Sequence, residues 1–275
     1  MSFSINTNLS SISAQDSLSR THLGLQQTLT RLSSGLRINS SADDAAGLAV
    51  ANRDLLDNTG LTVGIQAAND AISQLQIKDG ATSNVSDLLN RAMTLATQAA
   101  SSTFTGSRAT LDAEFQSVLS EITRNAGAAG LQTGSTDLTS RSVFVGNTQT
   151  NTAANVSYVS FTLTNAVDAQ GLGISTQNVT SQANAAAAIT ALQTAIGNLG
   201  TVQGTIGSAM NRLQFSINEA QTMSTSVQAA RSRIMDANMA QEASSLTKFN
   251  ILTQSGMASL AQANQSSASV LRLLQ

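Results

Sequence analysis

The chain has 275 residues, of which 41% are hydrophobic, but only 11% are charged and 3% are aromatic. Typical globular proteins carry roughly 25% charged residues and anchor their cores with large aromatic side chains, so this composition suits thin seams between long helices. The net charge of −2, without a basic block, argues against a nucleic-acid-binding protein. The lack of cysteine excludes disulfides and thiol chemistry, and the lack of proline fits long uninterrupted helices.

The first predicted helix covers residues 1–38. Its leucines recur at spacings of 7, 4, 3 and 4, which is typical of a helix that packs on another helix; they are Leu18, Leu25, Leu29, Leu32 and Leu36. The turn formers Gly35 and Asn39-Ser40-Ser41 then interrupt the pattern. Ser41 or Asp43 is predicted to cap a second helix, with Asp43 and Asp44 in its first turn, where the helix dipole favours negative charge.

Residues 44–100 continue the 3-4 spacing of apolar residues and predict one long second helix. A turn at 101–107 precedes a third helix, which ends in the small-residue stretch 125–130. The period then changes to two around Val143–Val145 and Val159–Leu163, which predicts two strands of a hairpin joined by a polar loop at 146–155. An isolated hairpin is marginal in water, so we expect it to lie on the helices.

Residues 183–234 carry the most regular spacing in the chain, of coiled-coil quality. A final helix is predicted over about 237–275. The chain therefore goes out along helices, turns through the hairpin and returns along helices. The predicted fold class is mainly α: an elongated antiparallel coiled-coil helical bundle with a small β-hairpin and with the N- and C-terminal helices paired.

No group of residues indicates catalysis, a metal site or a cofactor. The one histidine, His22, has no cysteine or acidic cluster near it, and Asp43 and Asp44 are adjacent residues that diverge by about 100° on a helix. Gly200, Gly204 and Gly207 lie among polar residues that exclude a bilayer, so close approach of another helix is the better interpretation. The chain is predicted not to be an enzyme and not to insert in a membrane.

The segment LSSGLRINSSADDAAGLAVANR, which begins at Leu32, closely resembles the N-terminal signature of bacterial flagellins. The C-terminal half carries further segments that resemble the family: IGSAMNRL from Ile206, SRIMDANMAQE from Ser232 and LAQANQSSASVLRLL from Leu260. Matches at both ends, in the family's order, are specific. The resemblance implies a structural subunit that self-assembles into the bacterial flagellar filament for swimming motility.

By this resemblance the chain divides into an inner coiled-coil domain, 1–43 and 236–275, and an outer helical domain, 44–178 with the hairpin and 179–235. Only a short connection joins 164 to 183, without the variable outer domains of many flagellins, which implies a minimal flagellin. The inner-tube assembly seam would consist of leucines at both ends of the chain, namely Leu25, Leu29, Leu32, Leu36, Leu246, Leu260, Leu271 and Leu274. Ordering about 40 residues costs roughly 1–2 kcal/mol apiece, so we expect both termini to fold only when neighbouring subunits cover them.

The resemblance also implies partners and a location. The chain would be secreted without a cleavable signal peptide, unfolded through the flagellar type III apparatus, and would polymerise with itself outside the cell. An export chaperone would mask Leu260, Leu271 and Leu274 on the C-terminal helix before assembly, and the filament would meet cap and hook-junction proteins. The alternative is a flagellin-like hook–filament junction protein. No cofactor is implied.

Many flagellins also present a patch to the vertebrate Toll-like receptor for flagellin. The matching residues here are Arg91, Leu95 and Glu114, although the family pattern RVREL is RAMTL from Arg91 and so has lost two charges. The structural alternative is that Leu95 is a core residue and the other two are surface residues.

Overall fold

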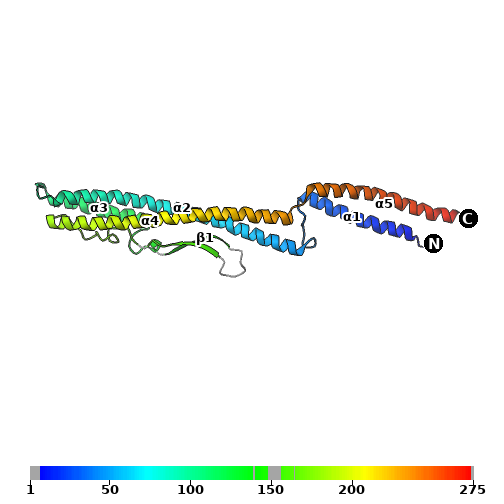
Figure 1. Cartoon of the computed structure of the whole chain (residues 1–275), viewed down its shortest axis with the longest axis horizontal. Coiled ribbons are helices and arrows are strands. Elements are labelled where there is room, and N and C mark those ends of the chain that lie inside the picture. Colours follow the sequence, from blue (N-terminus) through cyan, green and yellow to red (C-terminus); the bar gives the residue numbers. More distant parts are fainter. Residues whose placement is uncertain (1–6, 139, 148–155, 164, 274–275) are drawn as a thin grey trace. The chain divides into compact units, whose positions relative to one another are not determined.

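A computed structural model describes residues 7–138, 140–147, 156–163 and 165–273. Within these residues the chain forms helices α1 (Leu9–Ser34), α2 (Ala45–Ala100), α3 (Arg108–Ala128), α4 (Gln182–Met235) and α5 (Met239–Leu273). The short helix η1 (Thr136–Leu138) and strands β1 (Arg141–Asn147) and β2 (Val156–Phe161) lie between α3 and α4. The elements follow the predicted order, so the mainly helical fold class with one small hairpin is confirmed (Figure 1).

Short polar side chains cap the helices. Asn8, Ser107 and Ser181 each accept a hydrogen bond from a backbone N–H in the first turn of α1, α3 and α4, at 3.2, 3.4 and 3.2 Å. Asn238 accepts from two N–H groups of α5, at 3.2 and 3.3 Å. Each cap satisfies donors that have no partner within the helix, and together these residues fix where the helices begin.

The predicted cap of α2 was wrong by at least one residue. Asp44 stands immediately before the helix and accepts from the Gly47 N–H at 2.9 Å, so neither Ser41 nor Asp43 is the cap. No acidic residue lies in the first turn of α2. Asp43 instead closes the preceding turn, where its carboxylate accepts from the backbone N–H groups of Asn39 and Ser40.

Two units share the long helices α2 and α4. Unit 1 comprises residues 1–56 and 226–275, and unit 2 comprises residues 57–225. The helix breaks at 35–44 and 236–238 fall at the predicted domain boundaries, whereas the two units divide inside α2 and α4. The assignment of these parts to inner and outer filament domains therefore stays a prediction.

Unit 2 contains a continuous hydrophobic core made by α2, α3, α4 and the hairpin. Phe115 and Ile122 of α3 are fully buried and belong to the same core as Leu89 of α2 and Leu192 of α4. On α4 the buried stripe is rich in alanine: Ala185, Ala188, Leu192, Ala195, Leu199, Val202, Ile206, Ala209 and Leu213. The 3-4 spacing of apolar residues predicts Ile196 in this stripe, between Leu192 and Leu199. The structure differs there, because Ile196 is 37% exposed and Ala195 is buried.

The hairpin lies on the helices, as predicted. Arg212 of α4 donates to the Ser160 carbonyl of β2 at 2.9 Å, and Arg141 of β1 donates to the side chain of Gln74 of α2 at 3.1 Å. A Cβ atom at Gly64 would collide with the Val145 carbonyl, so glycine at this position lets β1 approach the α2 backbone. A bulge between Phe144 and Gly146 interrupts the predicted alternation and buries Val145 on the helices.

Helix α4 contains a window that is long and apolar enough, by length and composition, to cross a membrane. Its alanine and leucine stripe packs in the core of unit 2, and core helices of that composition meet the same criterion. The window is therefore weak evidence for a membrane span.

The predicted close approach of a helix at the α4 glycines was wrong. A Cβ atom at Gly200, Gly204 or Gly207 would meet no heavy atom within 4 Å. The glycines face away from the alanine stripe that makes the packing, so the spacing of glycine alone did not identify the packed face.

Candidate assembly surface

Helices α1 and α5 pair closely in unit 1, although they come from opposite ends of the chain (Figure 1). Glycine makes the approach close at two positions. A Cβ atom at Gly24 would lie 2.6 Å from the Phe249 ring, and one at Gly256 would lie 3.1 Å from Leu18 Cδ1. Each glycine therefore accepts a large side chain of the opposite helix against its backbone, which is the knob-and-hole contact of a helix pair.

Polar contacts fix the register at both ends of this pair. Near the N-terminal end of α1, Asn8 Nδ2 donates to the Ala263 carbonyl at 3.0 Å, and Ser11 donates to Asn264 Oδ1 at 3.0 Å. At the other end, Arg31 and Glu242 form an ion pair at 3.6 Å. The two helices are thus paired along most of α1.

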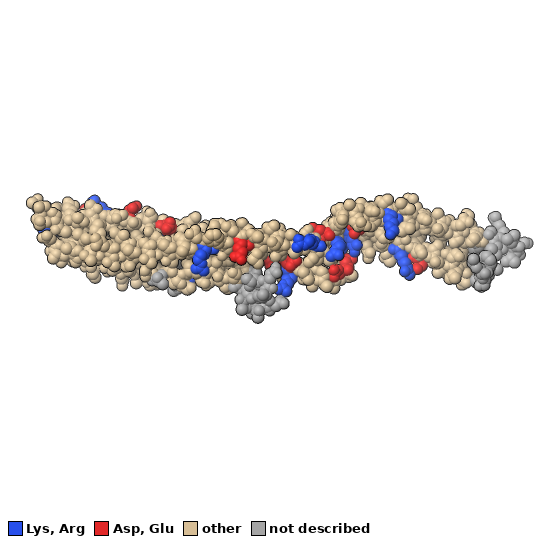
Figure 2. All heavy atoms as spheres, in the orientation of Figure 1, with Lys and Arg blue, Asp and Glu red and all other residues tan. Residues whose placement is uncertain are grey.

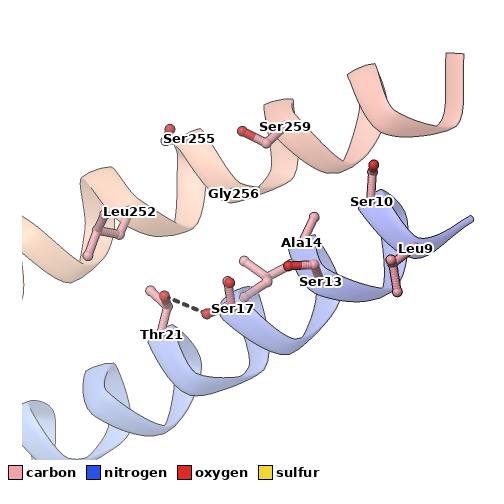
Figure 3. A pocket seen from close by; sticks show the side chains of 11 residues that line it. Leu9, Ser10, Ser13, Ala14, Ser17, Thr21, Leu252, Ser255, Gly256 and Ser259 are labelled. Atoms are coloured by element: carbon pink, nitrogen blue, oxygen red, sulfur yellow. Dashed lines mark hydrogen bonds between the residues drawn. The ribbon is translucent and has the colours of Figure 1, made fainter. Parts of the chain in front are cut away.

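A groove of about 640 Å³ opens between the two helices. Leu9, Ala14, Leu18 and Leu252 contribute its apolar lining, and Gly256 adds no side chain. The other lining residues bear hydroxyl groups, namely Ser10, Ser13, Ser17, Thr21, Ser255 and Ser259. Figure 3 shows Ser10 and Thr21 of α1 pointing toward α5, and the short side chains of the lining leave the groove open. Side chains from another chain can enter such a groove without displacing a core residue of this one.

Large apolar side chains remain exposed on both helices of the pair. Leu9 is 77% exposed, Leu23 and Ile251 are each 60% exposed and Met257 is 52% exposed. On the face of the molecule that Figure 2 draws, few charged side chains lie on the helix pair. Burying a leucine or isoleucine side chain contributes roughly 1.5–3 kcal/mol, so these exposed faces favour association with another apolar surface.

The predicted seam leucines occupy different environments. Leu25, Leu32, Leu36, Leu246 and Leu260 are half-buried, and Leu36 packs on a small cluster of Ile38, Ala51 and Met235. Leu29 is 46% exposed on the outer side of α1. The Leu271 backbone lies in α5, and Leu274 lies outside the described residues.

Sequence reasoning missed the residues that bring the pair together. Gly24, Phe249 and Gly256 lie at the interface, and Thr28 is the one described residue of α1 that is buried. An aromatic residue in one terminal helix and a glycine in the other were the available signals. A search limited to leucine spacing passes over both.

The breaks that end α1 and α4 are bonded to each other. The Arg37 N–H donates to the Met235 carbonyl at 2.6 Å, and the Ala237 N–H donates to the Gly35 carbonyl at 2.9 Å, which makes an antiparallel bridge. The Arg37 guanidinium also donates to the Ile234 carbonyl, at 2.8 and 3.2 Å. The guanidinium thereby satisfies a carbonyl of the last turn of α4. We call these hydrogen bonds between Gly35–Arg37 and Ile234–Ala237 the paired break.

Charge also stabilises the turn that follows α1. Hydrogen bonds from the backbone N–H groups of Asn39 and Ser40 hold the pKa of the Asp43 carboxyl below its ordinary value of 3.8. Gly35, at a φ of 71°, takes the left-handed conformation that commonly ends a helix. The turn is therefore determined by backbone conformation and by one exposed carboxylate.

The three residues of the candidate receptor patch do not share one environment, because two are half-exposed and one is buried. Arg91 and Glu114 are half-exposed and form an ion pair between α2 and α3, with the Arg91 Nε atom 3.1 Å from the carboxylate. Leu95 is 1% exposed and belongs to the core of unit 2. The geometry agrees with the structural alternative for Leu95.

No group of three or more histidine, cysteine, aspartate or glutamate side chains is placed to hold a metal ion in the described part of the chain. What the site offers is a pair of terminal helices with a groove between them and apolar faces outside it. This arrangement defines a class of protein, the helical subunit that completes its packing with other chains.

The comparisons with known proteins agree with that class. Residues 5–131 match the model of the bacterial flagellin N-terminal helical region, and residues 189–274 match the model of the C-terminal helical region. The chain belongs to the bacterial flagellin family. The two matched regions contain α1 and α5, so both halves of the helix pair belong to family segments.

Similar proteins match over nearly the whole chain. Flagellin FlaB2 of Treponema pallidum is 34% identical over 98% of this chain and 99% of its own length. The flagellar filament 33 kDa core protein of Treponema phagedenis is also 34% identical, with the same coverage. A crystal structure of Bacillus cereus flagellin is 28% identical, with a TM-score of 0.46 over 55% of this chain and 86% of that one.

Proposed function

We propose that this chain is a structural subunit of the bacterial flagellar filament and that it polymerises through the α1–α5 pair. The observation that carries the proposal is the pair itself, in which apolar side chains such as Leu9, Leu23 and Ile251 stay exposed. Such side chains become stabilising when copies of the chain cover them. The names of the relatives, flagellin and filament core protein, support the same function.

The inner tube of the filament would consist of residues 1–43 and 236–275 of many copies, and residues 44–178 and 179–235 would form the outer helical domain. Two paired helices each bury one stripe, which hardly offsets the entropy of ordering them. We therefore propose that α1 and α5 fold fully only in the polymer. Unit 2, which contains its own core, folds in the monomer.

The subunit reaches the cell exterior as an unfolded chain through the flagellar type III apparatus and has no enzymatic activity. Before assembly an export chaperone covers the apolar side of α5, where Ile251, Leu252 and Met257 are exposed. Cap and hook-junction proteins contact the ends of the filament. The Toll-like receptor for flagellin would contact the exposed Arg91–Glu114 pair, and receptor activation by the soluble monomer tests that contact.

Seeded assembly tests the filament function. Purified protein is added to short filament seeds at neutral pH and followed by electron microscopy, and long tubes should grow from the seeds. Decoration of seed ends without elongation would replace the filament function with that of a junction protein. No binding to seeds would refute both.

Leu260→Asp should abolish elongation, because a carboxylate would enter the half-buried interface of α5. Leu260→Met is the matched control, since it keeps an apolar side chain of similar volume and should elongate normally. Circular dichroism of both monomers should report the same folded unit 2. Normal filament yield from Leu260→Asp would contradict the role of this position.

A further inference from the structure

An aromatic side chain on α4 lies outside the packing of its own chain. Phe215 is 75% exposed, and every other phenylalanine whose side chain the structure describes is buried or half-buried. It stands two residues from Leu213, which is fully buried in the core of unit 2. The helix is thus firmly packed, and it presents Phe215 to the outside as an anchor that its own fold does not use.

The same unit contains a pocket of about 310 Å³ between α2 and the hairpin. Its apolar lining includes Leu75, Phe144 and Phe161. Leu75 is 1% exposed and Phe161 is 9% exposed, so these walls belong to the folded core. The pocket is of the size and polarity that accepts an aromatic ring.

Charges on the two surfaces are complementary. Lys78 and Arg141 line the pocket together with Asp70, which gives the pocket a net positive charge. The Lys78 side chain is 5% exposed and its ammonium donates to the Ala129 carbonyl at 3.2 Å, so it is held in place. Glu219 follows Phe215 by one helical turn on the same side of α4, it is exposed, and it forms no ion pair within the described residues.

We propose that Phe215 of one copy enters the α2–β1 pocket of a second copy, with Glu219 of the first copy paired to Arg141 of the second. The donor surface on α4 and the acceptor pocket are different parts of one unit, so the contact is heterologous. A heterologous contact that does not close into a ring generates an open helical polymer. The inference rests on the proposed filament function and adds a contact between the outer helical regions of neighbouring subunits.

Cross-linking tests this contact directly, because the chain contains no cysteine. Phe215→Cys and Ala67→Cys proteins, the second with its cysteine at the pocket, are mixed with excess wild-type protein, assembled on seeds and treated with a short bifunctional maleimide. Covalent dimers of the two variants should form in filaments and not in dilute monomer. Gln193→Cys, at an exposed position elsewhere on α4, replaces Phe215→Cys in the control and should give no dimer with Ala67→Cys.

Charge exchange provides a second test. Glu219→Arg or Arg141→Glu alone should slow elongation about tenfold, and the double variant should recover most of the rate. Phe215→Asp should slow elongation further, whereas Phe215→Leu should have little effect.

These experiments distinguish a failure of the proposed filament function from a failure of the proposed Phe215 contact. Wild-type protein that does not elongate seeds refutes the filament function. If wild-type protein elongates, yet Phe215→Cys and Ala67→Cys give no covalent dimer and Phe215→Asp elongates normally, this contact is refuted and the filament function stands.

Discussion

Units 1 and 2 are built from the same kinds of residue, yet they bury them differently. In unit 2 three helices and a hairpin surround one core, and α4 buries an almost continuous stripe from Ala185 to Ala220. In unit 1 the described buried residues are few: Thr28, Ile38, Ala51, Val227 and Met235. A stripe of alanine and leucine therefore becomes a core only where a third element covers it.

The comparison explains why exposed apolar residues concentrate in unit 1. Each helix of a pair contacts its partner with one stripe, and the remaining apolar positions face outward. Leu9, Ile12, Leu23, Ile251 and Leu252 are all at least 42% exposed. Further copies of the chain would provide the third element that unit 1 lacks.

The largest expected difference between the units is in proteolysis of the monomer. Local opening of weakly packed ends costs almost nothing, whereas cleavage in a core requires global unfolding. Trypsin should therefore cut at Arg20, Arg31 and Lys248 on the order of a hundred times faster than at Arg91 or Arg124. Mass spectrometry of timed digests measures the cleavage rates. Equal rates at the two sets of sites would show that the two units of the monomer are equally stable. In filaments the terminal sites should become resistant.

A substitution in the core of unit 2 should lower the stability of the monomer much more than a substitution in unit 1. Phe115→Ala removes a fully buried ring from unit 2 and should lower the free energy of unfolding by about 3–5 kcal/mol. Leu246→Ala in α5 should barely change the monomer's unfolding transition in urea, because its site is half-buried in a weakly stable pair. Equal losses for the two variants would show that α1 and α5 already contribute to the monomer's fold.

Two glycine-to-alanine substitutions should have opposite effects on stability, one destabilising and one stabilising. Gly24→Ala places a Cβ atom 2.6 Å from the Phe249 ring and should weaken the α1–α5 pair, which raises the concentration needed for elongation. Gly200→Ala meets open space in the interior of α4 and should stabilise unit 2 by about 0.5–1 kcal/mol. Sedimentation of filaments and thermal unfolding measure the two effects. A destabilised Gly200→Ala protein would restore the idea of a helix packed on that face.

The smallest expected effect is the pH dependence of the Asp43 turn. The folded chain holds the Asp43 pKa below 3.8, so the carboxylate stabilises the turn above the unfolded pKa, and this stability is lost as pH falls through the folded pKa. The local opening of residues 39–44, followed by NMR, should increase below about pH 4. In Asp43→Ala the opening should be larger at pH 7 and independent of pH in this range. Unchanged opening in that variant would exclude the carboxylate as the cause.

Much of this structure could be predicted from the spacing of apolar residues in the sequence alone. The helices, the hairpin and the pairing of the two termini were predicted from spacing, since helix and strand periods are local properties. Which side of a helix is buried was harder to predict. Ile196 fits the leucine–isoleucine pattern better than Ala195 does, yet Ala195 is buried, because small residues let helices approach closely.

Other features depend on contacts between distant residues. The bulge at Phe144–Gly146 and the bonds of Arg37 to Ile234 have no local signature. For the ring of Phe249 against Gly24 the residue types were a signal, but they do not show that the two residues meet. The cap of α2 was misplaced because Ser41, Asp43 and Asp44 all have the right chemistry, and only the fold selects among them. The sequence likewise could not show that Leu29 is exposed while Leu25 and Leu32 are half-buried.

The paired break joins residues that are synthesised far apart in time. Arg37 and Ile234 are separated by 197 positions, and the partner of α1 begins only at Met239. During synthesis, or passage through a narrow channel from the N-terminus, α1 therefore has no partner until almost the whole chain has emerged. Unit 2 already has all of its elements by then, so unit 1 is the last part of the molecule to form. We therefore expect a chain that stops short of α5 to form unit 2 and to leave α1 without its partner.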